Sequence, residues 1–266
     1  MSFPTGDLTP PTAFTDHVAM AQMERLATDM RQVYRRHKAA LAEVTQAQHD
    51  ALVCLAVAAG HRDDDTGTHI VRMGIVAEAL ALALGEPPAW ARLLRQAAPM
   101  HDIGKIGIPD AVLKKPGPLT PEERLVMNGH AAIGAQILGE SRSPLFQLAA
   151  EIALAHHERW NGSGYPSALA GAAIPMAGRI VAVVDFFDAL TMDRCYRPAF
   201  ADEIALEMLR AERGRAFEPV IVDTFLEHAA PLIALRDRLN AQPPAFSELF
   251  ADGFDAAADS SLAELA

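Results

Sequence analysis

The chain has 266 residues and a formal net charge of −11 at neutral pH, and 50% of its residues are apolar. This length and composition predict a buried hydrophobic core and exclude a wholly disordered protein. The acidic balance argues against binding to duplex nucleic acid, which requires many cationic contacts with phosphate. The chain has only two cysteines, Cys54 and Cys195, so a disulfide framework or a cysteine-rich zinc fold is not expected.

The sequence gives no sign of a secretory signal or of a membrane span. Residues 1–15 lack the basic and then apolar pattern of a signal peptide. No apolar run approaches the roughly 18 residues that a transmembrane helix needs. We therefore expect a soluble, cytoplasmic protein.

The first predicted element is a long helix. Residues 1–14 are rich in proline and predict a disordered lead, whereas no proline or glycine interrupts the chain from Thr15 until Gly60. A heptad can be written along the predicted helix at residues 15–50 and a little beyond. One heptad position holds Met23, Met30, His37, Val44 and Ala51, and the other holds Leu26, Val33, Ala40, Ala47 and Cys54. This seam contains a histidine and several alanines, so two interpretations stay open: a dimerising or signal-transmitting helix, and a long helix that packs on its own domain.

The rest of the chain predicts a series of helices with short polar breaks. The expected helices cover residues 68–84, 90–100, 120–138, 145–157, 176–190, 202–210 and 219–232. The clearest start is Thr120, which can cap a helix with Pro121 in its first turn and Glu123 closing a capping box. The alternation typical of strands is nearly absent, so we predict an all-α fold. Residues 237–266, with two prolines and an acidic, alanine-rich end, predict a C-terminal tail.

Seven side chains in this region have the chemistry of a metal site. They are His69, His101, Asp102, His130, His156, His157 and Asp185. Each has an ordinary alternative: the histidine pair can sit at a helix C-terminus, and Asp185 can accept a hydrogen bond from a neighbouring helix end. Imidazole and carboxylate without thiolate suit iron, manganese or zinc, and one carboxylate can bridge two metals. Two bridged metals are typical of enzymes that displace phosphate esters, so the set indicates a metal-dependent phosphohydrolase.

Longer strings around these residues carry a more specific resemblance. They are DDDTGTH at 63–69, HDIGKIGIPD at 101–110, LTPEE at 119–123, HHERWNGSGYP at 156–166 and DFFDALTMDRCYRP at 185–198. Together they resemble the HD superfamily of metal phosphohydrolases and, within it, the HD-GYP subfamily of cyclic di-GMP phosphodiesterases. The resemblance covers roughly residues 51–230 and is much more specific than a single short motif.

The resemblance implies an HD-type helical bundle, here residues 51–236, around a centre of two or three divalent metals, with iron or manganese expected. It assigns the first metal to His69, His101, Asp102 and Asp185, and the second to Asp102, His130, His156 and His157. A hydroxide bridging the metals would be the nucleophile. Lys105 matches the family lysine near the scissile phosphate and is assigned a catalytic role together with Asp102.

The resemblance also implies substrate contacts. Glycines in the loop at 162–166 would let the backbone approach the ligand closely, and Gly164 and Tyr165 are expected to touch the nucleotide. Arg194 and Arg197 match basic positions that bind phosphate or guanine, although either could instead pair with Asp188 or Asp193 on the surface. One departure concerns Asp65, which stands where members with three metals carry glutamate. Asp65 is the expected extra ligand if a third metal binds.

Three functions follow as hypotheses. The first is hydrolysis of cyclic di-GMP to linear pGpG, with slow continuation to GMP. The second is a nucleotide-binding sensor with little turnover, and the third is hydrolysis of another cyclic dinucleotide. The presence of all seven inferred ligands favours an enzyme, while nothing in the sequence separates guanine from adenine. Expected partners are cyclic di-GMP, diguanylate cyclase domains or other signalling proteins at the loop at 162–166 (the GYP loop), and a second copy of the chain.

Overall fold

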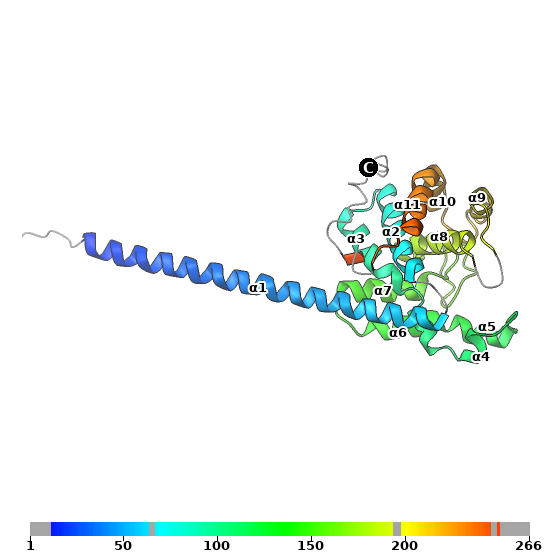
Figure 1. The fold of residues 1–266 in the computed structure, drawn as a ribbon, viewed down its shortest axis with the longest axis horizontal. Coiled ribbons are helices and arrows are strands. Elements are labelled where there is room, and N and C mark those ends of the chain that lie inside the picture. Colours follow the sequence, from blue (N-terminus) through cyan, green and yellow to red (C-terminus); the bar gives the residue numbers. More distant parts are fainter. Residues whose placement is uncertain (1–11, 64–66, 194–197, 246–248, 251–266) are drawn as a thin grey trace, which may run out of the picture. The chain divides into compact units, whose positions relative to one another are not determined.

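The computed structural model describes residues 12–63, 67–193, 198–245 and 249–250 (Figure 1). The chain divides into two units between Asp50 and Ala51. Each unit is described by itself below.

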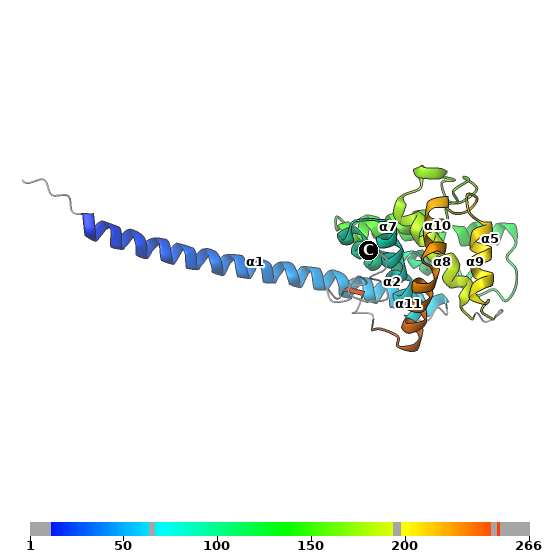
Figure 2. The same cartoon turned by 90° about the horizontal axis from the view of Figure 1, so that it is seen from above.

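The first unit consists of most of helix α1. This helix extends from Thr12 to Asp63, so it begins slightly before the predicted start at residue 15. It is continuous along its length, which confirms the predicted long helix (Figure 2). Every side chain from Ala19 to Ala47 is exposed. The absence of proline and glycine over this stretch explains why the helix is not interrupted.

The second unit is built from helices, as predicted. They are α2 (Gly67–Ala83), α3 (Pro88–Ala97), α4 (Asp110–Leu113), α5 (Pro121–Asn128), α6 (His130–Gly139), α7 (Pro144–Ala155), α8 (Met176–Thr191), α9 (Asp202–Ala211), α10 (Pro219–Glu227) and α11 (Ala229–Ala241), with three 3₁₀ turns, η1 (Ala98–Met100), η2 (Ile103–Gly107) and η3 (Gly171–Ala173). Within the described ranges there is no β-strand, and the only strand-like pairings are two isolated bridges.

Helices α2 and α8 form the centre of this unit. Every side chain of α2 from His69 to Ala81 is buried. Helix α2 packs against α3, α8 and α11, and α8 also packs against α7 and α9. The C-terminal end of α1 contributes Leu52 and Ala56 to the same core. A helix that is apolar on most sides is expected to be buried in this way. Its buried polar side chains include Arg72, which is paired with Asp188, and Glu78, which is paired with Arg95.

Two predicted helices are each divided in two. The stretch expected as one helix over 120–138 breaks at Gly129, so that His130 opens α6. The stretch expected over 219–232 breaks at His228, because Pro231 fits only the first turn of a new helix. The capping box at the start of α5 is confirmed: the Glu123 N–H donates to Thr120 Oγ1 at 3.2 Å, and the Thr120 N–H donates to Glu123 Oε2 at 2.8 Å.

The expected C-terminal tail does not begin at residue 237. Helix α11 continues to Ala241, and both Leu239 and Leu249 are buried in the core. The carbonyl oxygen of Leu249 also accepts a hydrogen bond from Arg95 Nε at 2.9 Å. Among the helices of the described ranges, none combines the length and the apolar character that crossing a bilayer requires.

Candidate metal centre

All seven predicted metal ligands lie in the second unit, where five segments bring them together. His69 comes from α2, His101 and Asp102 from the turn between η1 and η2, His130 from the start of α6, the pair at 156–157 from the end of α7, and Asp185 from α8. Ligand atoms of His69, His101 and Asp185 lie within 4.8 Å of one another, and so do those of Asp102, His130, His156 and His157. The two groups correspond to the two metals that the family resemblance implies.

Backbone carbonyl groups set the orientation of three of these histidines. His101 Nδ1 lies 3.1 Å from Ala98 O, His130 Nδ1 lies 2.8 Å from Met127 O, and His156 Nδ1 lies 3.0 Å from Ala153 O. A carbonyl oxygen only accepts hydrogen bonds, so each Nδ1 carries a hydrogen and each neutral ring keeps its lone pair on Nε2. This is the usual way in which proteins orient a histidine toward a metal.

The three Nε2 atoms converge on the carboxylate of Asp102. His101 Nε2 lies 3.2 Å from Oδ2, His130 Nε2 lies 3.2 Å from Oδ1, and His156 Nε2 lies 3.7 Å from Oδ1. The two oxygens of Asp102 therefore face different histidines. This arrangement suits a carboxylate that is shared between two cations.

Two buried polar atoms at the Asp102 carboxylate indicate whether these residues are suited to bind a metal ion. In the part of the chain that the structure describes, His101 Nε2 and Asp102 Oδ1 are buried without a hydrogen-bond partner. An imidazole lone pair beside a carboxylate oxygen is unfavourable unless a proton or a cation lies between them. The site therefore fits a divalent cation, and its nitrogen and oxygen donors suit iron and manganese.

The protonation of the site is consistent with cation binding. Burial lowers the pKa of His156, and burial together with the neighbouring His156 lowers the pKa of His157 to about 2. Burial would raise the pKa of Asp102, but Lys105 and His101 hold it well below its usual value. Burial would lower the pKa of His101, but the Asp102 and Asp185 carboxylates raise it to about 9. Without a cation, a proton on His101 thus supplies the positive charge that the carboxylates require.

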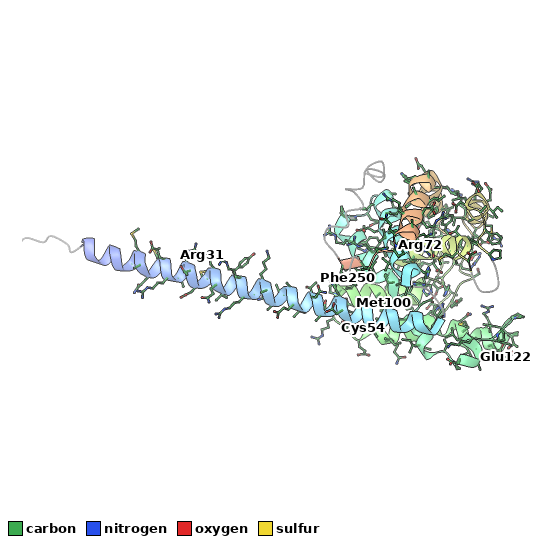
Figure 3. All side chains as sticks on the ribbon, in the orientation of Figure 1. Arg31, Cys54, Arg72, Met100, Glu122 and Phe250 are labelled. Atoms are coloured by element: carbon green, nitrogen blue, oxygen red, sulfur yellow. The ribbon has the colours of Figure 1, made fainter. Side chains whose placement is uncertain are left out.

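His69 is held by a buried carboxylate that the sequence analysis did not assign to the site. Asp188 Oδ2 lies 2.5 Å from His69 Nδ1, and Arg72 donates to Asp188 from Nε at 2.6 Å and from its second terminal nitrogen at 2.7 Å. Arg72 is 1% exposed and lies inside the second unit (Figure 3). Helical spacing was the available signal, because Arg72 follows His69 by three residues and Asp188 follows Asp185 by three.

Two predicted active-site residues border the metal centre. Lys105 Nζ lies 2.7 Å from Asp102 Oδ2, at the partly open edge of the site. The ring centre of Tyr165 lies 4.8 Å from that of His157, with the rings tilted by 31°. Burial raises the pKa of the Tyr165 hydroxyl, so the hydroxyl keeps its proton at neutral pH.

The structure explains why residue 164 must be a glycine, and the explanation differs from the expected close approach to a ligand. A Cβ atom at this position would lie 2.4 Å from Arg159 N and 2.6 Å from His157 O. The close approach is therefore to the chain's own backbone. The buried Glu158 strengthens the same loop by accepting hydrogen bonds from Ser167 N at 2.7 Å and Leu169 N at 2.9 Å.

Three predicted site residues, Asp65, Arg194 and Arg197, lie outside the described residues. Their assigned roles, including the third metal, stay predictions.

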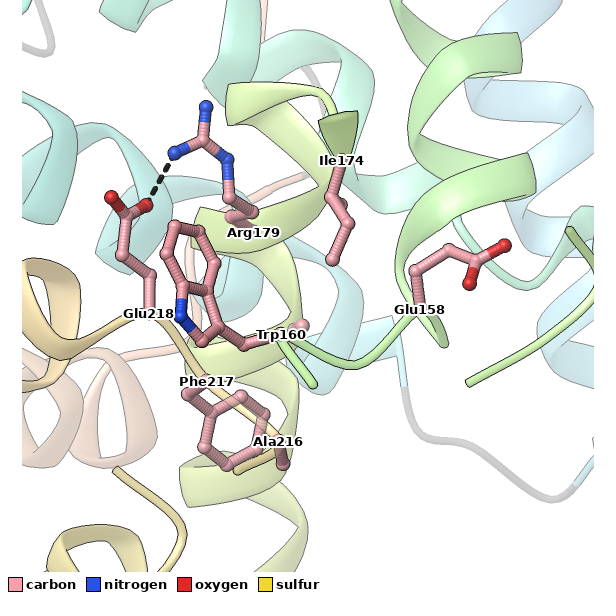
Figure 4. A pocket seen from close by; sticks show the side chains of 8 residues that line it. Glu158, Trp160, Ile174, Arg179, Ala216, Phe217 and Glu218 are labelled. Carbon is pink, nitrogen blue, oxygen red and sulfur yellow. Dashed lines mark hydrogen bonds and ion pairs between the residues drawn. The ribbon is translucent and has the colours of Figure 1, made fainter. Parts of the chain in front are cut away.

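A small pocket is lined by Glu158, Trp160 and residues of three other segments, and none of the seven predicted ligands lines it (Figure 4). Its wall includes Trp160, Phe217, and the ion pair of Arg179 with Glu218. The guanidinium carbon of Arg179 lies 5.9 Å from the Trp160 ring centre. These contacts give Trp160 a packing role.

Comparisons with known proteins agree with this geometry. The model of the HD domain family matches residues 65–221. The chain is 46% identical over 198 residues to the cyclic di-GMP phosphodiesterase response regulator RpfG of Xanthomonas campestris, covering 74% of this chain and 52% of the relative. It is 41% identical over 199 residues to 3'3'-cGAMP-specific phosphodiesterase 2 of Vibrio cholerae, covering 75% of this chain and 38% of the relative.

The match to a solved structure concerns the fold alone. A crystal structure of a cyclic GMP-AMP-specific phosphodiesterase of V. cholerae aligns with a TM-score of 0.53 at 19% identity, covering 76% of this chain and 54% of that one. The chain spans about half or less of the length of the relatives that it matches. The family match and these relatives confirm the resemblance to the HD-GYP subfamily, and the chain belongs to the HD domain family.

Proposed function

We propose that the chain is a metal-dependent phosphodiesterase that hydrolyses cyclic di-GMP to linear pGpG. One observation carries the proposal: three histidines, each oriented by a backbone carbonyl at Nδ1, converge through Nε2 on the carboxylate of Asp102. Divalent cations bound there would lower the pKa of a water molecule and neutralise negative charge on the scissile phosphate. The relative RpfG, whose name states this activity, supports the choice of substrate.

The residues at the site have distinct tasks in this proposal. Asp102 offers one oxygen to each group of histidines and so holds the two groups together. Lys105 contacts the same carboxylate at the edge of the site, where its ammonium group is placed to stabilise charge that develops on the phosphate. Tyr165 keeps its proton and can therefore stack on a base or donate a hydrogen bond.

A second cyclic dinucleotide, 3'3'-cGAMP, is a candidate for a specific reason. Two relatives of similar identity, at 41% and 46%, have names that state different substrates. Cyclic di-GMP and 3'3'-cGAMP differ in one base, so the described metal centre does not select between them. The substrate must be chosen by groups that contact the bases.

The test is a turnover assay with separated products. The protein, purified without chelator under anaerobic conditions, is supplied with iron(II) or manganese(II) and given each cyclic dinucleotide in turn. We expect linear dinucleotide from cyclic di-GMP with the wild type, no product with Asp102→Asn, and unchanged product with Asp223→Asn. The control changes an exposed aspartate that pairs with Arg213 outside the site.

The outcomes separate the candidate functions. Faster turnover of 3'3'-cGAMP would replace the proposed substrate but keep the enzyme. Binding of both nucleotides without turnover, in protein that holds its metal, would overturn the enzyme in favour of a sensor.

A further inference from the structure

Helix α1 exposes a row of large apolar side chains that no described part of the chain covers. Met23, Leu26, Met30, Val33 and Val44 are each between 57% and 69% exposed. Large apolar surfaces that face water usually mark a site of association.

The spacing of this row identifies the kind of surface. Intervals of three and four residues alternate without interruption through eight positions, which we call the seam: Met23, Leu26, Met30, Val33, His37, Ala40, Val44 and Ala47. Such a repeat averages 3.5 residues and is the pattern of a left-handed coiled coil. The opposite face of the helix is polar at Arg25, Thr28, Gln32 and Arg35. The seam is therefore a narrow apolar face that can pack against one other helix. The polar opposite face can stay in contact with water.

We propose that the seam pairs with the same seam of a second copy of this chain, as a parallel coiled coil in register. In this arrangement each seam residue meets its own counterpart. Seven of the eight layers then join two apolar side chains, and none buries a lysine, arginine, aspartate or glutamate. Because the seam carries no charged residue, two identical seams can pack together without repulsion. The seam also has no charge that would favour a partner helix of opposite charge.

His37 determines the orientation and the register. It is the one polar residue of the seam, and a parallel pair in register places it opposite the second His37. A shift by one heptad would place His37 opposite Met30 or Val44. In an antiparallel pair the His37 position can only face residues of the other seam position, such as Val33 or Ala40. Each of those arrangements leaves an imidazole among apolar groups without a polar partner, which is unfavourable.

The residues beside the seam agree with this pairing. In register, Asp29 of one copy lies beside Tyr34 of the other, and Glu43 lies beside Gln48. Arg36 lies beside Leu41, which its aliphatic stem can cover. No pair of like charges is brought together at these flanking positions.

The experiment measures the mass of the full chain in solution and compares two matched double variants. The wild type is expected at twice 28.6 kDa by light scattering or sedimentation. The Leu26→Glu/Val33→Glu variant adds two negative charges to the seam and is expected at the monomer mass. The Thr28→Glu/Gln32→Glu variant adds the same charge to the opposite face and is expected to remain a dimer. A monomeric wild type, or a seam variant that stays dimeric, would overturn the proposal.

A cross-linking test measures the relative orientation of the two α1 helices. It does not depend on whether the Leu26→Glu/Val33→Glu variant folds. In chains with Cys54→Ser and Cys195→Ser, a single cysteine is introduced at a seam position, Ala40→Cys, or on the opposite face, Ala42→Cys. Mild oxidation is expected to give a covalent dimer with Ala40→Cys and not with Ala42→Cys. A dimer that fails to cross-link through Ala40→Cys would contradict the parallel arrangement in register.

Discussion

Asp188 and His69 are 119 positions apart in the chain, yet Asp188 Oδ2 lies 2.5 Å from His69 Nδ1. Arg72 donates one hydrogen bond to each oxygen of the same carboxylate. The ring of His69 is therefore oriented by the protein itself, with Nδ1 held by Asp188.

Replacement of Asp188 by asparagine should weaken metal binding while leaving all seven predicted ligands in place. Loss of an orienting carboxylate of this kind typically lowers metal affinity about 10- to 100-fold. Titration calorimetry with manganese(II) measures the change, and Asp223→Asn, at an exposed pair with Arg213, is the control that should not change. Wild-type affinity in Asp188→Asn would show that the contact does not orient His69.

The same carboxylate predicts a loss of stability in acid. Burial would raise the pKa of Asp188, but the hydrogen bonds from His69 and Arg72 lower it from 3.8 to about 2. Because folding lowers this pKa, the ionised carboxylate stabilises the folded protein at every pH above the pKa of the unfolded state. This contribution is lost as the pH falls from about 4 through 2. The contribution at neutral pH is about 2 kcal/mol.

Denaturant titrations in the presence of a chelator test this dependence. The free energy of unfolding of the wild type should fall more steeply than that of Asp188→Asn between pH 4 and pH 2. Parallel curves for the two proteins would contradict the assigned cause.

Gly104 allows the turn that carries Lys105 to pack against α6. A Cβ atom at Gly104 would lie 1.9 Å from the carbonyl oxygen of His130 and 2.5 Å from Gly134 N. The neighbours are backbone atoms that cannot move aside, so Gly104→Ala should destabilise the protein by about 3 kcal/mol or more.

The matched control for this change is Gly139→Ala in the last turn of α6, where a Cβ atom would have no neighbour within 4 Å. The control should be neutral or stabilising by about 0.4–1 kcal/mol. Equal melting temperatures for the two variants would contradict the packing account.

Tyr165 should contribute to substrate binding without contributing to metal binding. Its ring lies beside His157, but Tyr165 belongs to neither group of predicted ligands. If the ring stacks on a base, Tyr165→Ala should raise KM roughly 5- to 150-fold at unchanged metal content, because such stacking contributes about 1–3 kcal/mol. Tyr165→Phe should restore KM. A loss of metal in Tyr165→Ala would instead assign the ring a role in the metal centre.

The sequence was sufficient to predict the all-α fold and to single out seven side chains that lie close together in the structure. The reason is that imidazole and carboxylate groups are costly inside a helical core unless they bind something, so their positions stand out. The family strings assigned one metal to His69, His101, Asp102 and Asp185, and a second to Asp102 and the remaining histidines. In the structure His69, His101 and Asp185 form one group, and Asp102 lies with the histidines of the other.

The contacts that support the site could not be predicted in the same way. Helical spacing places Asp188 one turn from Asp185, but its pairing with His69 depends on how α2 packs on α8. The ends of helices inside long apolar stretches were also missed. Gly129 and His228 each separate two helices where the apolar pattern continues through the break. The requirement for Gly164 became visible only once the loop was seen to pack against its own backbone.

The most direct test of the proposed metal centre is an anomalous-scattering experiment on crystals grown with manganese(II). Two peaks are expected, one on each side of the Asp102 carboxylate. One peak should be bound by His69, His101 and Asp185, and the other by His130, His156 and His157. Peaks elsewhere in the chain, or none at this carboxylate in metal-loaded crystals, would contradict the account.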